Sequence, residues 1–174
     1  MSGSGFSFQY SSIQLSTSIV YTPTVPTCTV TSPQNIPVDV GSAPVSGFVG
    51  IGSTSNTITP FSINLSCAGG STGTTTNMYM TVTDQTNPGN ISNVLTLDTS
   101  SGASGVGVQL RNSADAVISY GPDSRAAGNT NQWFVQNTGN GTVTIPLTAR
   151  LIQTNAHINP GTVVAYATYT LSYQ

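Results

Sequence analysis

The stretch GTVVAYATYTLSYQ, from Gly161 to Gln174, decides the fold of this chain. From Ala165 onward, small or apolar residues alternate with polar ones, and this period of two predicts a β-strand with one apolar face. The apolar face carries Ala165, Ala167, Tyr169, Leu171 and Tyr173, while Tyr166, Thr168, Thr170 and Ser172 lie on the other face. The sequence stops on this strand, although its pattern is typical of the middle of a sheet.

The composition indicates an all-β protein. The chain has 174 residues, of which 37% are hydrophobic and only 5% are charged, with no lysine and no glutamate. Long charged side chains favour helices, whereas the abundant Ser, Thr, Val, Asn and Gly suit strands and turns. The length fits one β-sandwich better than two domains.

Turns recur about every 8–15 residues, and no segment keeps a helical period, which is typical of an Ig-like sandwich. We expect residues 15–174 to form this domain, and residues 1–14 to be a linker, a tag, the remnant of a preceding domain or a donor strand. The other expected strands lie in SIVYT (18–22), NIPVDVG (35–41), FSINLSC (61–67), NMYMTVTD (77–84), SNVLTLD (92–98), SGVGVQLRNSADAVISYG (104–121) and GTVTIPLTARLIQT (141–154).

Several function classes are disfavoured. A net charge of −2 with scattered arginines argues against nucleic acid, and no apolar run is long enough for membrane insertion. The single histidine, His157, has no ligand-type neighbour, and a calcium site at Asp84 and Asn87 is less favoured than turn capping. Trp133 and Phe134 indicate the start of a buried strand rather than a sugar-stacking platform. We therefore expect no enzyme, no cofactor and no metal.

The two cysteines, Cys28 and Cys67, are not part of a CxxC motif or a Cys/His cluster. A metal site is therefore disfavoured, and one disulfide is expected if the compartment is oxidising.

Several motifs together resemble the pilin domains of chaperone–usher fimbriae of Gram-negative bacteria. TCTV around Cys28, FSINLSC at Cys67 and the glycine-valine strand SGVGVQL match the family pattern. The ending is the most specific match, because Gly161 is the fourteenth residue from the end and Tyr173 the second. These two positions, with alternating apolar residues between them, are the chaperone-recognition motif of the family.

The resemblance implies an incomplete Ig-like β-sandwich that lacks its last (G) strand and is completed by donor-strand complementation. It implies a Cys28–Cys67 disulfide, and as partners a periplasmic chaperone, an outer-membrane usher and the donor strand of the adjacent subunit. It places the protein in a fimbrium on the cell surface, reached through the periplasm. The residues expected at the chaperone and donor-strand groove are Gly161, Ala165, Ala167, Tyr169, Leu171, Tyr173 and Gln174.

The kind of subunit stays open at this point. The sequence favours the C-terminal pilin domain of a two-domain tip adhesin, because the apolar alternation in residues 6–19 slips at Ser11 and Ser12. The alternative is a complete shaft or tip pilin with its own N-terminal donor strand. Two alternatives of another class are a secreted carbohydrate-binding module and an accessory domain of a secreted enzyme.

Overall fold

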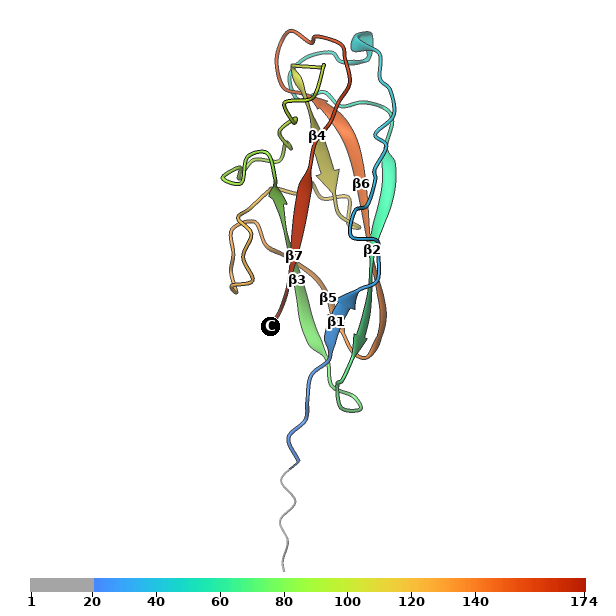
Figure 1. Cartoon of the computed structure of the whole chain (residues 1–174), viewed down its shortest axis with the longest axis vertical. Coiled ribbons are helices and arrows are strands. Elements are labelled where there is room, and N and C mark those ends of the chain that lie inside the picture. The colour runs from blue at the N-terminus through green and yellow to red at the C-terminus, as the bar shows by residue number, and fades with distance from the viewer. Residues whose placement is uncertain (1–20) are drawn as a thin grey trace, which may run out of the picture.

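The computed structural model describes residues 21–174 and shows two antiparallel sheets packed face to face (Figure 1). The first sheet has the strand order β1-β2-β6-β4, with β1 at Thr27–Val30, β2 at Thr59–Ala68, β6 at Gly141–Gln153 and β4 at Val106–Arg111. The second has the order β5-β3-β7, with β5 at Trp133–Thr138, β3 at Thr76–Asp84 and β7 at Ala167–Tyr173. The one helical element among the described residues is the 3-10 turn η1, Val45–Gly47. The predicted all-β fold is confirmed.

The core lies between the sheets and is built from every second side chain of the central strands. Ile63 and Leu65 of β2 are 2% and 1% exposed, and Met78 and Met80 of β3 are fully buried. The strand expected within residues 141–154 is present as β6, and five alternate side chains on one of its faces are buried: Val143, Ile145, Leu147, Ala149 and Leu151.

The loop between β4 and β5 covers part of the outer face of the three-stranded sheet. The side-chain amide of Asn129 donates a 3.1 Å hydrogen bond to the hydroxyl of Thr81, which is fully buried on that face. In the same region the hydroxyl of Thr170 on β7 donates to the carboxylate of Asp123. The outer face of β7 is therefore held by this loop as well as by its neighbour β3.

The segment 35–41, predicted to be a short edge strand, is not one. It forms no ladder, and Pro37 in its middle has no backbone N–H to donate. The side chains at alternate positions, Ile36, Val38 and Val40, nevertheless pack partly buried against the core. Because the hydroxyl of Thr59 donates a 2.7 Å hydrogen bond to the carbonyl of Asp39, the segment lies along the edge of β2.

The strand predicted at 92–98 is likewise reduced to a single bridge, Leu95↔Val108. Of the two strands predicted around a short polar turn in segment 104–121, the second is reduced to the bridge Arg111↔Val117. The chain there crosses from one sheet to the other. The amide of Ile118 donates to Leu110 in the first sheet, whereas the amide of Gly121 donates to Val82 in the second. A segment that changes partners within a few residues cannot build a ladder with either sheet.

The strand expected at 18–22 falls mostly outside the described residues. Within residues 21–174, no helix has the length and hydropathy needed to cross a membrane.

Candidate functional site: an open seam between the two sheets

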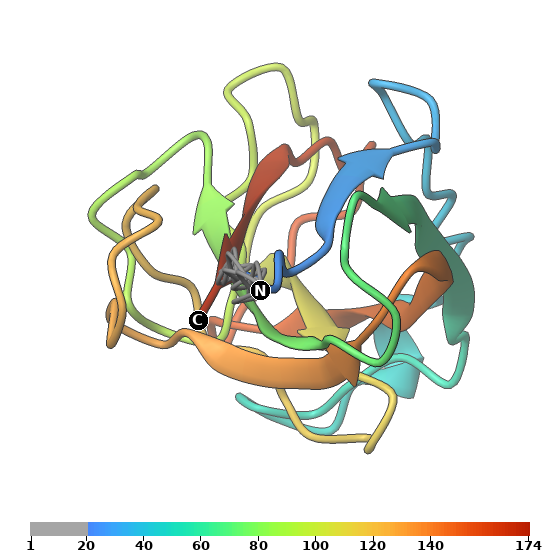
Figure 2. The same ribbon diagram turned by 90° about the horizontal axis from the view of Figure 1, so that it is seen from below.

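The last strand, β7, is an edge strand of the three-stranded sheet. It pairs with β3 from Ala167↔Asp84 to Tyr173↔Met78, and no strand among residues 21–174 pairs with its other edge. On the same side of the sandwich, β1 is the edge of the other sheet and pairs only with β2. Seen along the long axis, β7 in red and β1 in blue follow each other around the molecule without a strand between them (Figure 2). We call this strip the open seam.

The side chains along the open seam are only partly covered by residues 21–174. On β7 they are Tyr169, Leu171 and Tyr173, and facing them along the edge of the first sheet are Cys28, Ile36, Val38 and Val40. All of them contact the core, yet each remains partly exposed, while the inward side chains of the neighbouring β3 are fully buried. The seam therefore leaves apolar surface in water that one further strand would cover.

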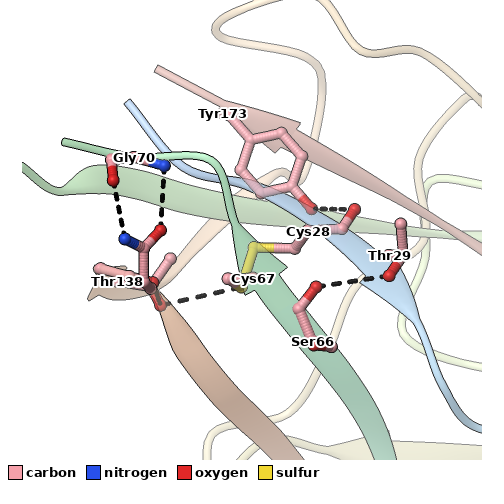
Figure 3. Close-up of a disulfide and its surroundings, with 9 residues drawn as sticks. Cys28, Thr29, Ser66, Cys67, Gly70, Thr138 and Tyr173 are labelled. Atoms are coloured by element: carbon pink, nitrogen blue, oxygen red, sulfur yellow. Dashed lines mark hydrogen bonds between the residues drawn. A yellow bond between two sulfur atoms is a disulfide. The ribbon is translucent and has the colours of Figure 1, made fainter. Parts of the chain in front are cut away.

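The lower end of the seam is closed by a tyrosine and the disulfide (Figure 3). Cys28 and Cys67 face each other in the β1–β2 register and are bonded, as expected. The hydroxyl of Tyr173 donates a 3.4 Å hydrogen bond across the seam to the carbonyl of Cys28. The disulfide fixes the edge strand β1 to β2, and Tyr173 joins that edge to the opposite sheet.

Burial raises the pKa of the Tyr169 hydroxyl. It also raises the pKa of the Tyr173 hydroxyl, where the positive charge of Arg125 has the smaller, opposite effect. Both phenols are therefore protonated at neutral pH, and Tyr173 can act as the donor towards Cys28.

Gly161 lies at the upper end of the seam, before β7 begins. Residues 162–164 pair with the loop 98–103 rather than with β3: the amide of Asp98 donates to Val164 at 2.8 Å and that of Ala103 to Thr162 at 3.0 Å. A Cβ atom at Gly161 would stand 2.3 Å from the carbonyl carbon of Gly102. A glycine is therefore needed here for close backbone packing.

The other residues expected at the groove lie as follows. Ala165 is partly buried against the core, Ala167 is exposed, and Gln174 is exposed while its backbone exchanges two hydrogen bonds with Asn77. On the opposite face the alternation fails at Ser172, which is 4% exposed because the sheet is covered there. The assignment of these residues to a binding groove stays a prediction.

The remaining candidates from the sequence belong to the scaffold. The carboxylate of Asp84 accepts hydrogen bonds from the amides of Thr86, Asn87 and Thr96 and from the side chain of Asn90. Trp133 begins β5 and packs against the core, while the exposed ring of Phe134 contacts Tyr79 edge-on, with 5.5 Å between ring centres. His157 faces Asn159 in a surface turn at 3.1 Å. No group of three metal-ligating side chains occurs in the described part of the chain.

The family model described as "Fimbrial protein" matches residues 13–174 of this chain. The chain belongs to the fimbrial protein family. As a fimbrial protein it is a component of bacterial cell-surface fimbriae. It is 34% identical over 157 residues to the F17c-G fimbrial adhesin of Escherichia coli, a match that covers 87% of this chain. The match spans 43% of that adhesin, so the fimbrial chain corresponds to under half of this relative.

Solved structures show the same fold. The rod subunit PapA of the P pilus has a TM-score of 0.60 at 19% identity, over 84% of this chain and 99% of PapA. The CupB6 tip adhesin from Pseudomonas aeruginosa has a TM-score of 0.58 at 19% identity, over 76% of this chain and 33% of the adhesin. The predicted Ig-like pilin fold is thereby confirmed.

Proposed function

We propose that the open seam is a strand-acceptor site, and that this fimbrial domain joins its fibre by donor-strand complementation. The observation that carries the proposal is the unpaired edge of β7 with its partly exposed side chains Tyr169, Leu171 and Tyr173. An inserted strand would hydrogen-bond to the free edge of β7, and its inward side chains would cover the apolar strip. The role is structural, and no catalytic step is involved.

Three partners follow from this role. A periplasmic chaperone would lend a strand to the seam after secretion, and an outer-membrane usher would receive the complex. In the fibre, the N-terminal extension of the adjacent subunit would replace the chaperone strand. Backbone pairing supplies affinity in each case, while the side chains along the seam select the register.

We further propose that the domain is the C-terminal pilin domain of a tip adhesin. The F17c-G relative is an adhesin and is more than twice as long as the matched region, which supports a missing partner domain. Residues 1–14 would then be a linker or remnant outside the domain at 15–174. The second candidate, a complete shaft or tip pilin, is favoured by the match to PapA over 99% of that rod subunit.

Removing residues 1–14 separates these two candidates. If the segment lies outside an adhesin's pilin domain, the shortened chain melts at the same temperature and binds the chaperone as before. If it is a donor strand, the shortened chain no longer fills the seam of another subunit in a strand-exchange assay.

Fusion of a donor strand tests the acceptor role itself. The N-terminal extension of the pilin encoded beside the chaperone and usher is attached after Gln174 through a flexible Gly/Ser linker. We expect the melting temperature to rise by about 10 °C or more, because a strand that binds only the folded state stabilises it. The control is the same extension with its apolar residues changed to serine. Equal melting temperatures for the fused and unfused domains would show that the seam accepts no strand; a soluble, stable monomer would then favour a carbohydrate-binding module.

A further inference from the structure

The turn that follows η1 holds two aliphatic side chains out in water. Val49 is 91% exposed and Ile51 is 69% exposed, and Val45 at the start of η1 is 42% exposed. Isolated exposed aliphatic residues are common, but a group of three between Val45 and Ile51 is an apolar surface that no other part of residues 21–174 covers. We call Val45, Val49 and Ile51 the pole turn.

The pole turn is held rigidly rather than left loose. Gln153, at the end of β6, is 5% exposed, and its side-chain oxygen accepts hydrogen bonds from the amide of Gly50 at 3.0 Å and the hydroxyl of Ser53 at 3.2 Å. The backbones of Gly52 and Ser53 also pair with Gln153 at 2.9 and 2.8 Å. A buried side chain thus fixes the shape of a turn whose tip, within the described part of the chain, is exposed, which is the arrangement of a pre-organised contact surface.

The pole turn lies at one end of the open seam. The segment with Ile36, Val38 and Val40 runs up the edge of the first sheet and leads directly into η1. In Figure 1, η1 is at the top of the molecule, whereas the chain before β1 leaves at the bottom, the pole where β7 also ends. The two ends of the seam are therefore different surfaces, one carrying the pole turn and the other carrying the N-terminal entry of the chain.

The direction of an inserted strand decides which end meets its donor. All strand pairs in the sandwich are antiparallel, and a strand that continues this pattern runs opposite to β7. Since β7 runs from the top to the bottom of Figure 1, such a strand enters with its N-terminal end at the bottom and leaves the seam at the top. Its own domain then begins beside the pole turn.

Building on the strand-acceptor function, we propose that the pole turn is the docking surface for the body of the subunit that donates the strand. The contact is head to tail, between the pole turn of one subunit and the N-terminal pole of the next. This chain's own N-terminal pole, as an example of such a pole in the family, carries exposed apolar side chains, Tyr21 at 68% and Val25 at 55%. Residues 40–83 contain no charged residue, so the contact is apolar and insensitive to salt.

The experiment compares two donors on the same domain: the full-length pilin encoded beside the chaperone and usher, and a peptide of its N-terminal extension alone. In Val49→Ser/Ile51→Ser we expect the complex with the full-length pilin to dissociate about tenfold faster or more, since two aliphatic contacts are lost. The peptide complex should dissociate at the wild-type rate, because the seam is untouched. Ile91→Ser is the matched control, since Ile91 is 65% exposed in another loop, and it should change neither rate.

The outcomes are distinguishable. If the peptide does not bind the wild-type domain, the strand-acceptor function fails. If both donors bind and the double variant releases the full-length pilin at the wild-type rate, the seam is real and the docking surface is refuted. If the double variant releases the peptide faster as well, the residues act on the seam and not on the donor body, which also overturns the inference. Melting curves of the free variants confirm that all of them fold.

Discussion

At the scale of single residues, the close backbone packing at the upper end of the seam depends on glycine. The motif in the sequence marks Gly161 by its distance from the end of the chain, but the structure supplies the reason for a glycine there. The backbone of residues 161–164 packs directly on the loop 98–103, where even a methyl group would overlap Gly102. The sequence could not show this contact, because the two segments are far apart along the chain.

Gly161→Ala should therefore destabilise the domain. We expect a loss of about 1–3 kcal/mol, because the added methyl group forces two backbones apart. The measurement is urea unfolding of the chaperone-free domain. Gly89→Ala is the matched control, since its Cβ would come no closer than 3.9 Å to another group, and it should change stability little. Equal stability of the two variants would contradict the packing role.

Asp84 is the second residue on which much of the structure depends. It is fully buried at the end of β3, where burial alone would raise the pKa of its carboxyl. The hydrogen bonds from Thr96, Asn90 and Asn87 outweigh that effect and lower the pKa below its ordinary value. A lowered pKa stabilises the folded state at pH values above the ordinary carboxyl range, and this stabilisation is lost as the pH falls through the lowered value.

Asp84→Asn should destabilise the domain by about 1.5–3 kcal/mol at neutral pH. The charge-assisted hydrogen bonds are lost, and the new side-chain NH2 group faces N–H donors that it cannot accept from. The difference from the wild type should shrink in acid, below the ordinary carboxyl pKa. Thermal unfolding at neutral pH and in acid tests this expectation. A constant difference between the two proteins across this range would refute the ionised state of the carboxylate.

At the scale of elements, segments with alternating apolar and polar residues were predicted as strands. The prediction was correct where such a segment pairs with a neighbouring strand and wrong where it does not. β2 and β6 alternate between core and solvent over most of their length, whereas β3 is buried on both faces from Met80 onward, and all three form long ladders. The segment 35–41 alternates equally well, yet it contains Pro37 and forms no ladder with any other segment of residues 21–174. β7 is the intermediate case, since the strands of the described chain pair with only one of its edges. Alternation reports which side chains face the core and does not report how many edges are paired.

Leu171→Ser/Tyr173→Ser tests the strip along β7. We expect the affinity for the chaperone to fall by at least about 100-fold, since two large apolar side chains no longer contact the inserted strand. Surface plasmon resonance with the purified chaperone gives the affinity. Thr168→Ser is the control, because Thr168 is exposed on the opposite face of β7, and it should bind as the wild type does. A wild-type affinity in the double variant would place the chaperone contact elsewhere.

At the scale of the whole molecule, the family and the fold could be predicted from the sequence because the ending motif and the two cysteines are specific. The strip of partly covered side chains on both sides of the seam could be seen only in the structure. It depends on Ile36, Val38 and Val40 lying opposite β7, a long-range arrangement without a local signal. The exposed side chains of the pole turn were also not predicted, because their exposure likewise has no local signal in the sequence.

The Cys28–Cys67 bond acts on the whole domain, because it closes a loop with a sequence separation of 39. Cys28→Ser/Cys67→Ser should lose about 4 kcal/mol on the chain-entropy model. The measurement is thermal unfolding of the double variant beside the unreduced wild type. Mass spectrometry showing two free thiols in the unreduced wild type would contradict the pairing.

The strand order also has a consequence for how this protein comes to be folded. β2 pairs with β6 and β3 pairs with β7, so each sheet is closed by a segment from the last third of the chain. Contacts between segments that are distant along the chain form slowly, because the chain between them must first be ordered. Until β6 arrives, the strands that precede it have unpaired edges and are prone to aggregate. The interval before β6 and β7 join their sheets is therefore the one in which this chain is most prone to aggregate. We expect a factor that shortens or shields this interval to raise the yield of folded protein more than one that stabilises the finished fold.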